Sequence, residues 1–240
     1  MNNCINKEHW NEVGVNYNNS WESYGKKEMS KKETGFIIKY LKKINPTLLL
    51  DLGVGTGRIL KTLSENTKTN SEIYGLDISS VMVAICKEKF KDNKKIKEIK
   101  IRDIANKDNF LKNKFDFITA IRVLKYNENW RLIIKKVYNH LNSGGIFVFT
   151  MPNSKSINRF FKGAISMHRT STKELRKVSA GSGFEILEIR SFTKLPDFFY
   201  DISKNLLLAK CTLFVEKILE LIFGKIFLGR VLFIAVKRNE

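Results

Sequence analysis

The residues best suited to chemistry in this 240-residue chain are Asp51, Gly53, Gly55 and Gly57, which lie in the segment DLGVGTGR. The segment follows an apolar run and precedes a helical pattern, so we expect it at the carboxyl end of a strand. Glycines there allow positive φ angles and a close approach of backbone to ligand. NAD-binding loops are also glycine-rich, but they space their glycines G-x-G-x-x-G, whereas these follow G-x-G-x-G after an aspartate.

Two further carboxylates follow the next expected strands. Asp77 ends the run 72–77, where a carboxylate can accept hydrogen bonds from both hydroxyls of a ribose. Asp103 comes just after the run 96–101, where an adenine amino group could donate to it. The glycine loop and the two acids therefore indicate a site for a ligand that carries a ribose and an adenine.

Two side chains are candidates for a catalytic base. His168 is expected between a strand at 145–151 and a helix near 171–181, and an ordinary histidine pKa near 6.5 suits proton transfer. A lone histidine in a basic loop is more often a surface residue. Tyr126, after the strand at 115–121, is the second candidate. The three histidines and three cysteines show no metal-ligand spacing, so no metal site is predicted.

Alternating strands and helices are expected to position these residues, which predicts a doubly wound α/β fold with a mostly parallel sheet. The expected elements are a helix at 31–44, strands at 47–52, 72–77, 96–101, 115–121 and 145–151, helices after Gly57 and at 79–91, 129–141 and 171–181, and strands at 184–192 and 229–237. The long insertion before the final strand lets that strand pair antiparallel. We divide the chain into an N-terminal helical cap (1–45) and a second domain (46–240) with an apolar helical insertion at about 197–227.

The insertion contains an unusually apolar helical segment at about 199–223. Its charged residues exclude a membrane span but allow a helix that lies at a membrane surface. Three interpretations of this segment stay open. It could be ordinary core over one face of the sheet, it could line an apolar substrate pocket or contact a membrane, or it could form a dimer interface.

In these motifs the chain resembles the class I S-adenosylmethionine (SAM)-dependent methyltransferases of small molecules. DLGVGTGR, GLDISSVMV, RDI and FDFITAIRVL are similar to the first four motifs of that family, and LNSGGIFVFTMPN to its fifth strand. The resemblance runs from about residue 47 to 192. It implies a Rossmann-like methyltransferase fold with seven strands, the last one antiparallel, and SAM as the cofactor, with S-adenosylhomocysteine as its product.

The resemblance also implies roles for individual residues. Gly53, Gly55 and Gly57 would face the methionine part of SAM, and Asp51 would order the loop. Asp77 would hold the ribose. The remaining implied contacts are Ile78 and Met82 on the adenine, Asp103 and Ile104 at the adenine edge, Ile121 near the sulfonium, and Tyr17 and Trp21 as a cover. Arg122 departs from the small or apolar residue that is usual after Ile121.

The expected activity is methyl transfer to a small-molecule acceptor, with oxygen favoured and a hydrophobic or lipid-linked substrate as one option. No Asn-Pro-Pro-aromatic motif occurs, which argues against methylation of planar nitrogens. The net charge of +19 keeps an RNA or protein methyltransferase as an alternative, although lysines are spread along the whole chain. A non-catalytic SAM-binding protein is a further alternative.

The location expected from composition is the cytoplasm. The cysteines are scattered and odd in number, and the first ten residues are too polar for a secretory signal. Membrane contact through 199–223 is added as an alternative, while nucleic acid is the less favoured partner.

Overall fold

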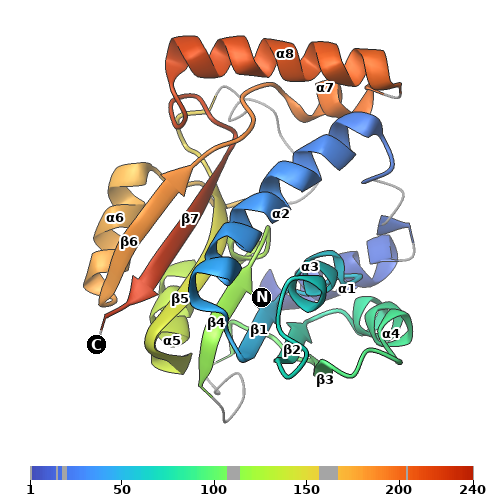
Figure 1. The fold of residues 1–240 in the computed structure, drawn as a ribbon, viewed down its shortest axis with the longest axis vertical. Coiled ribbons are helices and arrows are strands. Elements are labelled where there is room, and N and C mark those ends of the chain that lie inside the picture. Colours follow the sequence, from blue (N-terminus) through green and yellow to red (C-terminus); the bar gives the residue numbers. More distant parts are fainter. Residues whose placement is uncertain are drawn as a thin grey trace.

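A central seven-stranded sheet organises the molecule in the computed structural model (Figure 1). The model describes residues 2–14, 16–17, 21–106, 114–156, 167–203 and 205–239, with the side chains of 2–6 left undescribed. The strand order is β3-β2-β1-β4-β5-β7-β6. Strands β1 to β5 are parallel, and β7 pairs antiparallel with both β5 and β6. The predicted doubly wound sheet with an antiparallel last strand is therefore confirmed.

The order along the chain alternates as expected. The strands are β1 (Leu48–Leu52), β2 (Glu72–Asp77), β3 (Ile96–Ile101), β4 (Phe115–Ala120), β5 (Leu141–Pro152), β6 (Phe184–Arg190) and β7 (Val231–Arg238). The helices are α1 (Asn2–Gly14), α2 (Tyr24–Ile44), α3 (Arg58–Glu65), α4 (Ser80–Lys89), α5 (Trp130–His140), α6 (Thr172–Gly181), α7 (Asp197–Asp201) and α8 (Leu206–Phe223), with a short 3₁₀ turn, η2 (Leu124–Tyr126), after β4.

Two hydrophobic cores lie on opposite faces of the sheet, as apolar strands covered on both faces require. One core joins α2, α3 and α4 to the sheet through residues such as Ile37, Leu60 and Cys86. The other joins α5 and α6 through residues such as Trp130 and Leu175. Because α2 contributes to the first core, it is part of the packed layer and more than a loose cap; the boundary at residue 45 stays a prediction.

The N-terminal helices differ from the sequence-based expectation. Helix α2 begins seven residues before the predicted start at 31, because Ser23 caps it: its hydroxyl accepts a hydrogen bond from the Lys26 amide at 3.2 Å. Helix α1 was not predicted. Its sequence has little apolar periodicity, so only tertiary contacts distinguish it from a loop.

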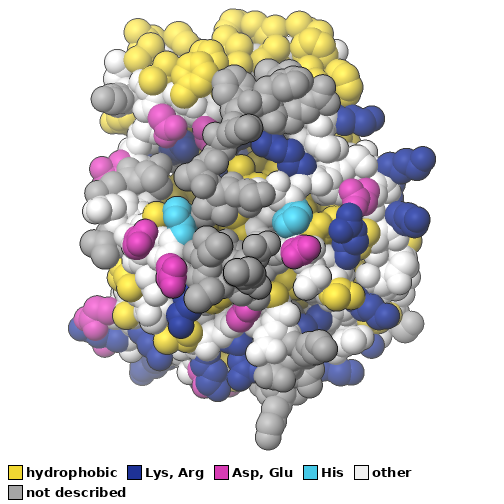
Figure 2. Space-filling view, turned by 180° about the vertical axis from the view of Figure 1, so that it is seen from behind, with side chains coloured by type: hydrophobic (Ala, Val, Ile, Leu, Met, Phe, Trp, Pro, Cys, Tyr) yellow, Lys and Arg dark blue, Asp and Glu magenta, His cyan; other side chains and the backbone are white. Residues whose placement is uncertain are grey.

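The apolar segment forms two helices, α7 and α8, at one end of the molecule. Hydrophobic side chains cover this end in the space-filling view (Figure 2). Helix α8 packs beside α2 and α7 and does not cover the sheet as ordinary core, since of its residues only Ala209 and Glu216 are buried. No helix in the described ranges is both long and apolar enough to cross a bilayer.

Candidate functional site

The glycine loop turns tightly between β1 and α3 and is tied to β2. The amides of Gly53 and Val54 both donate to the Leu76 carbonyl, at 2.7 and 3.0 Å. Gly53 has φ +74° and Gly55 has φ +52°, in the region that side chains rarely adopt. A Cβ on Gly53 would lie 2.7 Å from a Val123 methyl. The loop therefore needs glycine at position 53 for both its backbone angle and its packing.

Asp77 stands against the glycine loop at the end of β2. One carboxylate oxygen, Oδ2, accepts the Gly55 amide at 2.8 Å, and Oδ1 accepts the Ser79 amide at 2.9 Å. Burial raises the pKa of this carboxyl. Each carboxylate oxygen has a second lone pair, so Asp77 can still accept hydroxyl groups from a ligand.

A cavity of about 180 Å³ opens beside Asp77 and the loop. The structure brings ten of the sequence-predicted site residues to its wall: Tyr17, Gly53, Gly55, Asp77, Ile78, Met82, Asp103, Ile104, Ile121 and Tyr126. These residues come from the loop, the ends of β2 and β4, the start of α4, the segment after β3 and the N-terminal region. The site therefore lies at the carboxyl ends of parallel strands on both sides of β1, the expected place for a ligand in this fold.

Four predicted residues do not line the cavity. Gly57 caps α3 and faces α4, since a Cβ there would lie 2.4 Å from the Phe90 ring. Trp21 stacks between two arginines. His168 donates its backbone amide to the Lys125 carbonyl at 2.8 Å, and its side chain is not part of the cavity wall.

Asp51, the fourth of these, lies fully buried on β1 next to the loop. Thr119 donates to its Oδ1 at 2.7 Å, while Oδ2 has no hydrogen-bond partner among the described residues. Burial, with repulsion from Asp77, raises the pKa of Asp51 to about 7. A buried carboxylate oxygen without a donor is costly, so this atom indicates a place for a donor from a ligand or from water.

Glu33, Arg58 and Arg122 form a network of ion pairs next to the glycine loop. Glu33 of α2 is 1% exposed and accepts hydrogen bonds from Arg58, at 3.0 Å, and from Arg122. The Trp21 ring lies over both guanidinium groups, with centres 4.3 Å from Arg58 and 4.9 Å from Arg122. Burial opposes ionisation, but the two arginines outweigh it and lower the pKa of Glu33. Trp21 thus supports the site indirectly.

Arg122 follows β4 in an unusual conformation. Its φ is +65°, and its amide donates to the Thr150 hydroxyl at 2.7 Å. Its guanidinium binds Glu33, which gives a structural role to the residue that departs from the family pattern. Glu33 raises the pKa of Arg122 against the effect of burial, so the side chain stays charged.

Lys125 is the cavity residue best suited to accept a proton. Burial, with repulsion from Arg122 and Arg230, lowers its pKa to about 7. Its ammonium nitrogen lies 4.7 Å from the centre of the Tyr126 ring. Burial raises the pKa of Tyr126, so that phenol stays protonated at neutral pH and is a poor base there. Lys125 is therefore a further candidate for the base, and the roles of His168 and Tyr126 stay predictions.

The sequence reasoning also missed Trp10, Arg102, Val123 and Asn127, which line the same cavity. Trp10 belongs to α1 and packs edge to face on Tyr126 and Tyr17, with centroid distances of 5.1 and 6.1 Å. The aromatic content of residues 10–24 was the available signal for a cover. No group of three metal-ligating side chains occurs in the described part of the chain.

Comparison with known proteins agrees with this geometry. Residues 50–147 match the family model described as a methyltransferase domain. A demethylmenaquinone methyltransferase of Lactococcus lactis is 31% identical over 40% of this chain, and the match spans 38% of that enzyme. An uncharacterized protein of Methanocaldococcus jannaschii, MJ1252, is 26% identical over 81% of this chain and 70% of its own length.

Solved structures share the whole fold at low sequence identity. The magnesium protoporphyrin IX methyltransferase of Synechocystis, solved with bound SAM, superposes with a TM-score of 0.68 at 13% identity, covering 100% of this chain and 98% of that one. The [4+2]-cyclase SpnF superposes with a TM-score of 0.71 at 16% identity, covering 100% and 97%. Residues 50–147 therefore match a methyltransferase domain, and the whole chain has the fold of the class I SAM-dependent methyltransferases. The cofactor of that family is S-adenosyl-L-methionine.

The residues present fit that cofactor. Asp77 and Asp103 offer acceptors for ribose and adenine, Ile78, Met82 and Ile104 offer apolar surface, and Asp51 Oδ2 offers an unmatched buried acceptor beside the loop. The mixture of two carboxylates with apolar side chains matches a nucleoside with hydroxyl, amino and aromatic parts.

Proposed function

We propose that the protein transfers the methyl group of SAM to a small, hydrophobic acceptor molecule. The observation that carries this proposal is the hydrogen bond from the Gly55 amide to Asp77 at the wall of the cavity, with Asp103 and Ile104 beside it. This arrangement supports an adenosine site directly beside the glycine loop. The demethylmenaquinone methyltransferases among the relatives support an acceptor of small size.

Bound SAM supplies an electrophilic methyl group on a positively charged sulfur. The protein's task is then to hold the acceptor in line and to exclude water, and positioning alone can contribute on the order of 7–11 kcal/mol. Trp10 and Tyr17 close the cavity from the N-terminal side, and Tyr126 closes it from η2. Their edge-to-face contacts give the site an aromatic cover.

The lowered pKa of Lys125 favours a methyl acceptor that carries a hydroxyl group. An amine with a pKa of about 7 is partly unprotonated at neutral pH and can take the proton that the hydroxyl loses. Transfer to carbon, which the printed name of one relative from Wigglesworthia glossinidia states for that enzyme, is the competing possibility for the acceptor atom. The oxygen acceptor expected from the sequence therefore stays a prediction.

Cofactor binding is the first test. Calorimetry with SAM and S-adenosylhomocysteine should show binding to the wild-type chain, and Asp77→Asn and Asp103→Asn should each weaken it by about tenfold to a hundredfold. Asp92→Asn, an exposed carboxylate on the segment after α4, is the matched control and should bind as the wild type does. Absence of binding to the wild type, or equal affinities for the Asp77 and Asp92 variants, would refute the proposed site.

Methyl transfer needs its own assay, because the SpnF cyclase shows that this fold also occurs in a protein named for another reaction. Methyl-labelled SAM is supplied together with a solvent extract of small molecules, total RNA or a protein mixture. We expect label in the small-molecule fraction. Label only in RNA or protein would favour the alternative based on the net charge of +19.

A further inference from the structure

Helix α8 is amphipathic in the opposite sense from a normal surface helix: its carboxylates face the protein and its apolar residues face outward. Glu216 is 3% exposed and accepts the amides of Lys194 and Leu195 at 2.8 Å, as well as the Tyr200 hydroxyl. Glu220 pairs with Arg190 at 3.5 Å. These polar contacts fix which face of the helix is turned inward.

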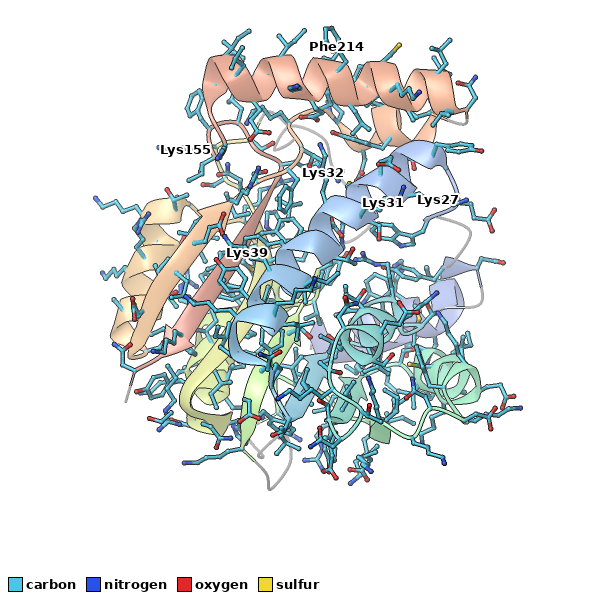
Figure 3. The ribbon with its side chains drawn as sticks, viewed as in Figure 1. Lys27, Lys31, Lys32, Lys39, Lys155 and Phe214 are labelled. Atoms are coloured by element: carbon cyan, nitrogen blue, oxygen red, sulfur yellow. The ribbon has the colours of Figure 1, made fainter. Side chains whose placement is uncertain are left out.

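The outward face is a continuous apolar stripe. Four of its side chains are between 65 and 87% exposed: Leu207, Phe214, Leu221 and Ile222. Figure 3 shows Phe214 on the side of α8 that is turned away from the rest of the molecule. Phe198, Ile202 and Phe227, each at least 50% exposed, extend the apolar surface beyond both ends of the helix. An exposed patch of this kind marks an interaction surface.

The charges around the stripe are positive. Lys210 and Lys217, spaced at seven residues, are exposed along one edge of the stripe, and neither forms a salt bridge within the described residues. The nearby acids already have cationic partners: Asp197 pairs with Arg230 and Lys26, and Asp201 with Lys26. Lys27 and Lys31 of α2 lie beneath α8 (Figure 3), and Lys31 pairs with Glu28.

We propose that the outer face of α8 docks on an anionic lipid surface, with the helix axis parallel to the bilayer. The apolar stripe enters the boundary between headgroups and acyl chains, while Lys210 and Lys217 reach the lipid phosphates. A helix with this pattern and no capacity to span the bilayer is typical of a peripheral contact. The docking does not depend on which reaction the cavity supports.

A second copy of the chain is a poorer occupant of this face. The midpoint between Lys210 and Lys217 lies one residue before the middle of α8. A two-fold antiparallel pair of these helices, crossing at their midpoints, would therefore set Lys210 of one copy beside Lys217 of the other. Two like charges beside an apolar seam oppose self-association, whereas both favour an anionic bilayer.

Vesicle flotation with the full chain tests the proposal. We expect binding to vesicles of phosphatidylcholine with phosphatidylglycerol, and much weaker binding to phosphatidylcholine alone. Phe214→Ser with Ile218→Ser should reduce the partition coefficient at least a hundredfold, since each loses its apolar contribution. The matched control, Leu132→Ser, removes a side chain of α5 that is 65% exposed and should leave binding unchanged.

The charge contribution has a separate control. Lys210→Gln with Lys217→Gln should weaken binding to the anionic vesicles on the order of thirtyfold. Lys87→Gln with Lys94→Gln removes two exposed lysines far from α8 and should change binding much less. All four side chains are exposed, so circular dichroism should show unchanged folding.

Cys211, exposed on the outer face of α8, provides a local probe in a Cys4→Ser background. A polarity-sensitive fluorophore on Cys211 should shift to the blue when anionic vesicles are added. Failure of the wild type to float with anionic vesicles would overturn the proposal. So would sedimentation showing a stable dimer that Phe214→Ser with Ile218→Ser dissociates while no vesicle binding is seen.

Discussion

Replacing Glu33 by glutamine is the sharpest test of how the site is supported. Glu33→Gln keeps the shape of the side chain but leaves the guanidinium groups of Arg58 and Arg122 without their buried anion. Removing one partner of a fully buried ion pair costs about 3–5 kcal/mol. The arginine side chains are 24% and 18% exposed, so we expect a smaller loss, of about 2–3 kcal/mol.

The loss is measured by urea unfolding at pH 7, and it should lower the melting temperature by about 4–12 °C in a chain of this size. Glu28→Gln is the control, since Glu28 on the same helix pairs only with an exposed lysine, Lys31, and should cost less than about 1 kcal/mol.

The pH dependence supplies a second readout. The folded pKa of Glu33 is below its ordinary value of 4.5, so the carboxylate stabilises the fold above that value and loses its effect as the pH falls through the folded pKa. The wild type and Glu33→Gln should therefore differ fully at pH 7, and the difference should shrink as the pH falls below 4.5 and through the folded pKa. Equal stability of the two at pH 7, or a difference that widens in acid, would refute the reasoning.

Further predictions concern the cavity wall, the glycine loop and the core. The rate of methyl transfer should rise with pH through about 7 as Lys125 loses its proton, and Lys125→Gln should lose this rise in a pH–rate profile. Because the unfolded chain keeps the Lys125 proton up to higher pH, the stability of the wild type relative to Lys125→Gln should also increase between about pH 7 and 10 in urea unfolding. Gly53→Ala should destabilise the fold by at least about 2 kcal/mol, because Gly53 has a φ of +74° and a Cβ there would meet Val123. Gly35 lies in the middle of α2 with open space around it, so Gly35→Ala should stabilise the fold by about 0.5–1 kcal/mol in the same assay. Burial raises the pKa of Cys86 to about 12, so in a Cys4→Ser background a thiol reagent should modify Cys211 at once and Cys86 only after unfolding; rapid modification of both in the native state would contradict this.

The strands and the glycine loop could be predicted because local signals agree with the fold. Apolar runs end at Asp51 and Asp77, and glycines follow Asp51 where the chain must turn, so the carboxyl ends of these strands could be recognised. Helix α1 was missed because it lacks an apolar periodicity and is held by contacts with α4.

The site was predicted less completely for a related reason. A lysine at position 125 looks like any surface lysine until the fold brings Arg122 and Arg230 near it and buries it. Gly57 belongs to the correct motif, but its lack of a side chain is needed because the Phe90 ring packs against it. This contact joins residues far apart in the sequence.

The orientation of helix α8 could not be predicted from the sequence either. The sequence predicts an apolar helix with charged residues in this region, but it does not say which face turns inward. That choice depends on Glu216, which meets Tyr200 and the amides of Lys194 and Leu195 only in the folded chain. A periodic pattern thus predicts a helix and its faces, while the partner of each face is a tertiary property.

The contact of α1 with α4 has a consequence for the timing of turnover. The Ser79 hydroxyl donates to Asn11 Oδ1 at 2.7 Å, and the Ser79 amide donates to Asp77. Ser79 therefore contacts both helix α1, which carries Trp10, and the carboxylate of Asp77. Because Trp10 lines the cavity, we expect a spent nucleoside to leave only after Trp10 moves away from the cavity wall. We therefore expect the residence time of S-adenosylhomocysteine to follow the opening rate of α1, and a chain without this helix to exchange its nucleoside quickly while holding it weakly.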